Sequence, residues 1–276
     1  MNRVIVLGID ALEYTLVEEW DLKYLKQERY CKIDLSDFDI IVTPPIWGSM
    51  ITGKVEQELM MPFKEKKKKE MSWWWKLGMK LPKLIKFLYW KHVNQNPFDK
   101  TSTYYVGHQT IFDFFINPWN NGIPSYGRNV SPRDIRLLTI RCITEKNVEP
   151  LLKYAKKEFE IDKEKLFNAL KENYDLIFWY TPSVDRIGHR LFHNKLYMMN
   201  LYFELNQMIR EVKKIAGNDV IYIVSDHGMI LDKKTKSGEH SSYGFFSSNT
   251  GECIKKPQDL FYLIKEKSPL VRRCEK

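Results

Sequence analysis

The chain has 276 residues, of which 43% are hydrophobic and 29% charged, values typical of a globular protein with one substantial core. A net charge of +9 favours phosphate-bearing partners, namely nucleotides, nucleic acid or anionic lipid surfaces, or it simply serves solubility. The four cysteines form no CxxC pair, which argues against a thiolate zinc site and a disulfide scaffold. No apolar run is long enough for a spanning helix or a signal peptide, so we expect a cytoplasmic protein.

The first predicted element is a buried strand over Arg3–Gly8, because the sequence RVIVLG is a continuous apolar run. Asp10 follows this strand directly. Its carboxylate either caps a predicted helix over Leu12–Trp20 or serves as a metal ligand at the end of the strand. We favour the ligand role.

Two further short strands are predicted over Tyr30–Leu35 and Asp39–Val42, and Thr43 comes next. Pro44 is suited to the first turn of a helix, and Gly53 is suited to its end. Thr43 is therefore predicted at the N-cap, with its hydroxyl beside free backbone N–H groups and the positive end of the helix dipole. A phosphate or a developing alkoxide suits that place, whereas an ordinary helix cap is the alternative.

Residues 60–100 interrupt the alternation of strands and helices. They contain a lysine run, Lys64–Lys69, and aromatic residues interleaved with lysines at roughly helical spacing. One interpretation is a basic amphipathic segment that lies on a membrane surface or over the active site. The other is an insertion whose aromatic rings pack on the main domain while its lysines face water. His92 and His108, in or near this segment, receive no ligand role.

The middle of the chain is less informative. A helix start is predicted over Thr110–Phe115 and a loop over Asn117–Ser125, which contains two prolines. Two polar helices are predicted over Glu145–Phe159 and Asp162–Glu172, and the next buried strand over Tyr174–Tyr180.

Asp185 and His189 follow that strand and are four residues apart. On a helix this spacing places both side chains on one face, where they could chelate a single ion. His193 extends the same row by another four residues. The alternative is a surface helix in which Asp185 is merely an acidic residue of the first turn.

A long amphipathic helix is predicted over Asn194–Ile215, followed by a short buried strand over Ile221–Val224. Asp226 and His227 end this strand, and Gly228 allows a turn or a close backbone approach. Ligands of open α/β sheets bind outside the carboxyl ends of the strands, so the pair is a candidate for metal binding. A polar turn is the alternative for these residues alone.

His240 follows on a loop and is either a surface histidine or a further ligand. A strand is predicted over Tyr243–Ser248, a closing helix over Pro257–Lys265 and a frayed tail over Leu270–Lys276.

Together these residues resemble the alkaline phosphatase superfamily, and within it the type I phosphodiesterase/nucleotide pyrophosphatase family. LGIDA is similar to the first metal-ligand strand of that family, and the segment from Thr43 to Thr52-Gly53 is similar to its nucleophile segment. VDRIGH resembles its Asp-x-x-x-His motif, SDHGM resembles its Asp-His-Gly motif, and the His240 loop resembles the loop with its last histidine. The matches are short and are spread from residue 4 to about residue 249.

The resemblance implies a three-layer α/β sandwich with a mostly parallel sheet and a centre of two divalent metal ions, Zn²⁺ or Mn²⁺. One ion would be held by Asp185, His189 and His240, and the other by Asp10, Asp226 and His227, with Thr43 as a bridging ligand and nucleophile. Thr43 would form a covalent phospho-threonine intermediate. The implied substrate is a phosphate ester, such as a nucleotide or a lipid head group.

The sequence departs from this family where nucleotide-cleaving members carry an asparagine that stabilises a phosphate oxygen, because that region here is Lys64–Lys69 and the aromatic segment. Diester specificity therefore stays open, with a phosphomonoesterase or phosphomutase on the same core as an alternative. A non-catalytic basic protein that binds membrane or nucleic acid is a further alternative. We expect one catalytic domain over residues 1–276, with residues 60–100 as a cap or surface insertion.

Overall fold

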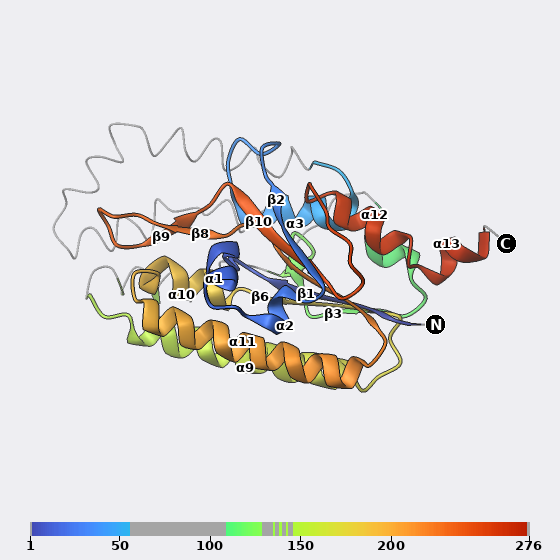
Figure 1. Cartoon of the computed structure of the whole chain (residues 1–276), viewed down its shortest axis with the longest axis horizontal. Coiled ribbons are helices and arrows are strands. Elements are labelled where there is room, and N and C mark those ends of the chain that lie inside the picture. The colour runs from blue at the N-terminus through green and yellow to red at the C-terminus, as the bar shows by residue number, and fades with distance from the viewer. Residues whose placement is uncertain are drawn as a thin grey trace.

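The structure is a computed structural model, and it describes residues 2–55, 109–128, 135, 138, 139, 142 and 146–274. The predicted insertion over residues 60–100 lies outside these residues, as do His92 and His108. The described chain forms a central sheet with helices on both sides, and its two ends lie on the same side of the molecule (Figure 1).

Six strands form the central sheet. Their order across the sheet is β2 (Arg29–Asp34), β10 (Tyr243–Ser248), β7 (Val220–Ser225), β1 (Val4–Ile9), β6 (Leu176–Thr181) and β3 (Pro118–Asn120). β10 runs antiparallel to both of its neighbours, whereas the pairs that β1 forms with β6 and β7 and that β6 forms with β3 are parallel. Every residue of β1 and β6 is buried, which explains why both read as continuous apolar runs. The prediction of a mostly parallel sheet is confirmed.

Helices cover both faces of this sheet, as Figure 1 shows. One face packs against α1 (Tyr14–Glu19), α2 (Lys23–Lys26), α9 (Glu149–Ala169), α10 (Ser183–Leu191) and α11 (Lys195–Ala216). The other packs against α3 (Thr43–Thr52), the 3₁₀ helix η1 (Ile111–Phe114) and α12 (Asp259–Lys265). Successive residues of β1 alternate between the two cores, as the pleat of a strand requires. The fold is therefore the expected three-layer α/β sandwich.

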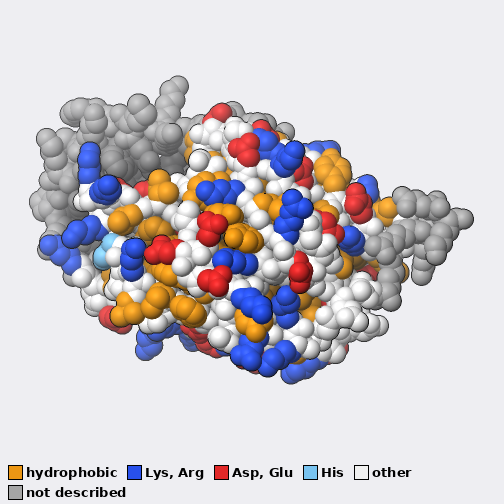
Figure 2. Space-filling view, viewed as in Figure 1, with side chains coloured by type: hydrophobic (Ala, Val, Ile, Leu, Met, Phe, Trp, Pro, Cys, Tyr) orange, Lys and Arg blue, Asp and Glu red, His pale blue; other side chains and the backbone are white. Residues whose placement is uncertain are grey.

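Smaller elements lie outside the central sheet. They are the strand pair β4 (Ile123–Pro124) and β5 (Gly127–Arg128), the antiparallel pair β8 (Met229–Leu231) and β9 (Gly238–His240), and α13 (Pro269–Cys274). None of the described helices combines the length and the apolar character needed to cross a bilayer. On the face seen in Figure 2, lysine and arginine side chains are interspersed with acidic ones.

One strand prediction and one loop prediction are wrong. Asp39–Val42 forms no strand: Val42 has extended dihedral angles, with φ −144° and ψ 143°, but no ladder partner in the described part of the chain. The predicted loop Asn117–Ser125 instead holds β3 and β4. β3 begins with Pro118 at the edge of the sheet, where a missing N–H does not interrupt a ladder.

Two helix predictions also need correction. The separate helices predicted over Glu145–Phe159 and Asp162–Glu172 are one continuous helix, α9, because no glycine or proline interrupts Glu160 and Ile161. The predicted frayed tail contains α13, which starts at Pro269, a favourable residue for a first helical turn.

Gly8 allows α3 to approach the carboxyl end of β1. A Cβ atom at this position would lie 2.7 Å from Cη2 of Trp47 and 3.1 Å from the carbonyl oxygen of Trp179. The Trp47 ring is fully buried and meets the Tyr180 ring edge-on, with centroids 5.2 Å apart. Only a residue without a side chain fits beneath this ring, so Gly8 sets the distance between α3 and the end of the sheet.

We predict that Gly8→Ala lowers the free energy of unfolding by about 1–3 kcal/mol, because the added methyl group overpacks a rigid buried site. Urea denaturation measures the change. Gly251→Asn is the control: a Cβ there meets no atom within 4 Å, and asparagine tolerates its positive φ of +85°. Equal stability of the Gly8→Ala protein and the wild type would contradict this account of the packing.

Candidate active site

Three neighbouring parallel strands end at the same edge of the sheet, and each is followed by a segment that carries polar side chains. Asp10 follows β1, the helix α10 follows β6, and Asp226 follows β7. β1 pairs with both β6 and β7, so these three chain segments are adjacent by topology. The candidate site is therefore assembled at the carboxyl ends of the strands, where open α/β sheets bind ligands.

One cluster joins Asp185 and His189 of α10 to His240 of β9. Nε2 of His189 lies 3.2 Å from Oδ1 of Asp185, and Nε2 of His240 lies 3.5 Å from the same oxygen. The two Nε2 atoms are 3.1 Å apart. His189 Nδ1 lies 2.8 Å from the Gly238 carbonyl oxygen, and His240 Nδ1 lies 2.9 Å from that of Ile41. Because a carbonyl only accepts, both Nδ1 atoms carry a proton, and both Nε2 atoms face Asp185.

A second cluster is formed by Asp10, Asp226 and His227, all of which are buried. His227 Nε2 lies 3.4 Å from Oδ1 of Asp10 and 3.4 Å from Oδ2 of Asp226. The other oxygen of Asp10 accepts a hydrogen bond of 2.5 Å from the Tyr180 hydroxyl. The rings of His227 and His240 stack with centroids 3.7 Å apart, so the two clusters are in contact.

Thr43 lies beside both clusters. Its side chain is buried, and Oγ1 is 3.5 Å from Nε2 of His227. The structure corrects its predicted position by one residue: Val42 is the N-cap, and Thr43 is the first residue of α3. Asp10 is not a helix cap either, because the N-cap of α1 is Glu13, whose side chain accepts a hydrogen bond from Thr15 N.

A cavity of about 210 Å³ opens onto these residues. Asp10 and Thr43 contribute to its wall together with Asp185, His189 and His240. Ile135, Leu151 and Pro182 supply an apolar side. A small molecule in this cavity would therefore meet the threonine hydroxyl and residues of both clusters from one side.

The donor set fits divalent metal ions. Ligand atoms of Asp185, His189 and His240 lie within 4.8 Å of one another, as do those of Asp10, Asp185 and His227. Four carboxylate oxygens, Asp10 Oδ1, Asp185 Oδ1 and both of Asp226, are buried without a hydrogen bond to the rest of the described chain. Buried carboxylates are normally paired or coordinate a metal, and carboxylate with imidazole is a donor set typical of zinc and manganese.

The burial of these charged groups and their closeness to one another also shift their pKa values. Burial, followed by repulsion from Asp226 and Asp185, raises the pKa of Asp10. Burial raises the pKa of Asp226 to about 7. Burial and repulsion from His240 lower the pKa of His227, so its imidazole is neutral. Burial opposes the charge of His189, but the Asp185 carboxylate outweighs it and raises the His189 pKa to about 9.

All seven residues singled out from the sequence thus lie at this edge of the sheet, whereas His193 does not. His193 is exposed, and its Nδ1 lies 2.8 Å from the carbonyl oxygen of Lys236. The structure differs from the expected ligand grouping in one respect. The ligand atoms that lie within 4.8 Å of one another around Asp10 and His227 include one from Asp185 and none from Asp226. Asp226 borders that group through its contact with His227.

Sequence reasoning missed Glu13, which holds the loop after β7 in place. This buried carboxylate accepts hydrogen bonds from Met229 N at 2.8 Å and from the Tyr243 hydroxyl at 2.6 Å. A Cβ on Gly228 would lie 2.1 Å from Oε2 of Glu13, so the loop requires glycine there. No sequence signal connects Glu13 to a loop that is more than 200 residues further along the chain.

Arg186 and Arg190 were also missed, although a signal for them existed. They are four residues apart on α10, next to the row of Asp185 and His189, and both line the same cavity. Arg186 is buried and forms an ion pair with Glu158, which also pairs with Arg128 at 3.0 Å. The spacing rule that identified the acidic and histidine pair applies equally to this arginine row.

No curated protein is matched by this chain. A family model described as Type I phosphodiesterase / nucleotide pyrophosphatase matches residues 4–237, which include Asp10, Thr43, Asp185, His189 and Asp226-His227. The match covers most of the chain, and the sheet and the polar edge described above agree with it. The chain therefore belongs to the type I phosphodiesterase/nucleotide pyrophosphatase family.

Proposed function

We propose that the protein is a two-metal phosphoester hydrolase that cleaves phosphodiesters or pyrophosphates with Thr43 as the nucleophile. The observation that supports this most directly is the position of the Thr43 hydroxyl. It lies 3.5 Å from His227 Nε2. It also shares one small cavity with Asp10, Asp185, His189 and His240. A buried hydroxyl at the start of a helix, facing unsatisfied carboxylates, suits phosphoryl transfer better than a role in packing alone.

In this proposal Asp185, His189 and His240 would hold one ion, Asp10, Asp226 and His227 would hold the other, and Thr43 would be a further ligand. Zn²⁺ and Mn²⁺ both suit these ligands. Bound there, the two ions would lower the pKa of the Thr43 hydroxyl and neutralise charge on the phosphate oxygens.

The reaction divides into two displacements at phosphorus. The Thr43 oxygen attacks, a new bond forms between Oγ1 and phosphorus, and the bond to the departing alcohol or phosphate breaks as that group takes up a proton. Water then attacks the phospho-threonine and restores the hydroxyl. Tyr180 holds Asp10 through its hydrogen bond, while the carbonyl oxygens of Gly238 and Ile41 keep the Nε2 atoms of His189 and His240 directed into the site.

The structure does not favour the non-catalytic alternative. A protein that only binds membranes or nucleic acid has no use for three aspartates and three histidines gathered around a buried hydroxyl, because such a cluster destabilises the metal-free fold. Membrane contact through residues 60–100 stays a prediction outside the described part of the chain. The choice between mono- and diester substrates belongs to the same proposal, with the diester preferred on family membership.

We predict that Thr43→Ala lowers kcat/KM for bis(p-nitrophenyl) phosphate about a thousandfold or more, because the nucleophilic oxygen is gone. Thr43→Ser retains a hydroxyl and is expected to stay within about tenfold to a hundredfold of wild type. Thr235→Ala, in an exposed turn, is the matched control with wild-type turnover. Undiminished turnover by a folded Thr43→Ala protein would remove Thr43 from the mechanism.

A second prediction concerns metal and pH. The pKa of Asp226, about 7, and that of His189, about 9, lie above their unfolded values of 3.8 and 6.5. The metal-free folded protein therefore binds these two protons more tightly than the unfolded chain does. The stability that results is fully present below the unfolded pKa values and is lost as pH rises through the folded pKa values. Between pH 6.5 and 9 the metal-free protein is therefore expected to become less stable.

Metal binding requires the deprotonated ligands, so added Zn²⁺ or Mn²⁺ is expected to raise the thermal midpoint more at about pH 8 than at about pH 6. Differential scanning fluorimetry at both pH values measures the increment. Asp185→Asn should abolish most of it, whereas Glu164→Gln, an exposed carboxylate on α9, should leave it unchanged. An increment that is equal at the two pH values, or larger in acid, would contradict the proposed ligand set.

A further inference from the structure

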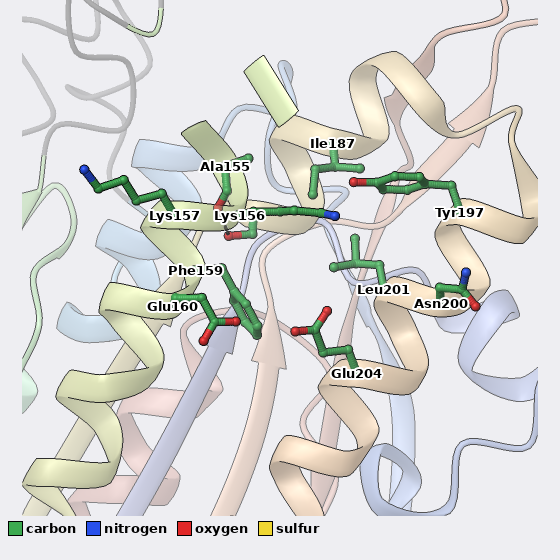
Figure 3. Close-up of a pocket in the computed structure, with 11 residues that line it drawn as sticks. Ala155, Lys156, Lys157, Phe159, Glu160, Ile187, Tyr197, Asn200, Leu201 and Glu204 are labelled. Carbon is green, nitrogen blue, oxygen red and sulfur yellow. Dashed lines mark hydrogen bonds between the residues drawn. The ribbon is translucent and has the colours of Figure 1, made fainter. Parts of the chain in front are cut away.

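A second cavity lies on the opposite side of α10 from the candidate active site. Its volume is about 360 Å³, and α9, α10 and α11 enclose it (Figure 3). Ser183 and Ile187 face this cavity, whereas Asp185 and His189 of the same helix face the other. The two cavities share no lining residue, so the second is a separate place on the molecule.

The floor of the second cavity is apolar. Phe159, Ile187 and Leu201 line it and are 3%, 1% and 8% exposed. In Figure 3 Leu201 lies between the polar groups of the upper and lower parts of the cavity, with Ile187 in the upper part and Phe159 in the lower. An apolar chain of a ligand would cover this floor, and the burial of apolar surface favours that.

The two ends of the cavity carry opposite charge. At the upper end in Figure 3, the Lys156 ammonium group is directed toward Tyr197, and Nζ lies 5.8 Å from the centroid of its ring. The Tyr197 hydroxyl oxygen is buried and makes no hydrogen bond to any described residue. At the lower end lie the carboxylates of Glu160 from α9 and Glu204 from α11.

These charges do not compensate one another. Within the described ranges, Lys156 and Glu204 form no ion pair, and the nearest cation to Glu160 is Lys163 at 3.9 Å on the same helix. A tyrosine hydroxyl and an ammonium group are both donors, suited to an anionic group, while two carboxylates from two helices suit an ammonium group.

Helix geometry sets the distance between the ends. Lys156 and Glu160 are four residues apart on α9, a rise of about 6 Å. Tyr197 and Glu204 are seven residues apart on α11, a rise of about 10 Å. A ligand that meets both ends must therefore hold its two charges several bonds apart.

We propose that this cavity binds a small zwitterion whose ammonium and anionic groups are separated by an apolar chain spanning about 6–10 Å. The ammonium group lies between Glu160 and Glu204, the apolar chain covers Leu201, and the anionic group accepts from Lys156 and the Tyr197 hydroxyl. Neither charge alone suffices, because a single exposed ion pair contributes little to affinity. The site is independent of the proposed hydrolase activity.

Isothermal titration calorimetry of the full-length protein tests this proposal with 6-aminohexanoate as the probe. Its isomer 2-aminohexanoate has the same atoms but adjacent charges, and hexylamine and hexanoate each carry one charge. We expect binding of 6-aminohexanoate below about 10 mM and at least tenfold weaker binding of the other three. No binding of 6-aminohexanoate, or equal binding of its isomer, overturns the proposal.

Surface variants locate the bound molecule. Glu204→Gln, Lys156→Met and Tyr197→Phe are each expected to weaken binding about threefold to tenfold. Lys153→Met is the matched control with unchanged affinity, because Lys153 is an exposed lysine of the same helix and is not among the residues that line the cavity. Thermal unfolding verifies that each variant is folded. Binding that survives all three substitutions places the probe elsewhere and overturns the assignment, whether or not the protein hydrolyses phosphate esters.

Discussion

The burial of two neighbouring aspartates, Asp10 and Asp226, beside a third, Asp185, is the constraint on which the rest of this structure depends. Asp10 and Asp226 lie at the ends of adjacent parallel strands, where burial raises the free energy of each charge and the neighbouring carboxylates raise it further. Burial also opposes the charge of Asp185, but His189 and His240 outweigh it and lower the Asp185 pKa. A fold that gathers like charges needs packing energy from elsewhere. Two hydrophobic cores, one on each face of the sheet, supply it, and both extend to the strand ends where the aspartates begin.

The arginines near Asp10 and Asp226 do not cancel the charge of these two carboxylates. Arg128 and Arg186 lie close by, but they are matched by Glu158 and Asp162, with Arg128 at 2.6 Å from Asp162. The Arg128 guanidinium also stacks over the ring of Tyr180, which holds Asp10. The network therefore orients the tyrosine while leaving Asp10 and Asp226 uncompensated, an arrangement that favours the binding of cations.

The sequence predicted the strands of this edge better than their surroundings. β1, β6 and β7 are continuous apolar runs, and a strand buried on both faces can be recognised without knowing its neighbours. β3 was missed because an edge strand of three residues depends on its partner β6 more than on its own composition. Asp39–Val42 was over-predicted for the converse reason: its apolar composition suggested a strand, but the chain bends at Asp39 and Ile40 and finds no ladder partner among the described residues.

The site shows the same division between local and distant information. Asp185 and His189 could be identified because their spacing repeats within one helix, and the neighbouring row of Arg186 and Arg190 could have been found by the same rule. The role of Glu13 could not, because its partner Met229 is close only after the sheet has formed. α10 combines both kinds of information: its spacing marks one polar face, but only the fold shows that another face borders a second cavity. A helix that borders two cavities has no simple division into one buried and one solvated face. Its polar residues therefore read, from sequence alone, like those of an ordinary surface helix.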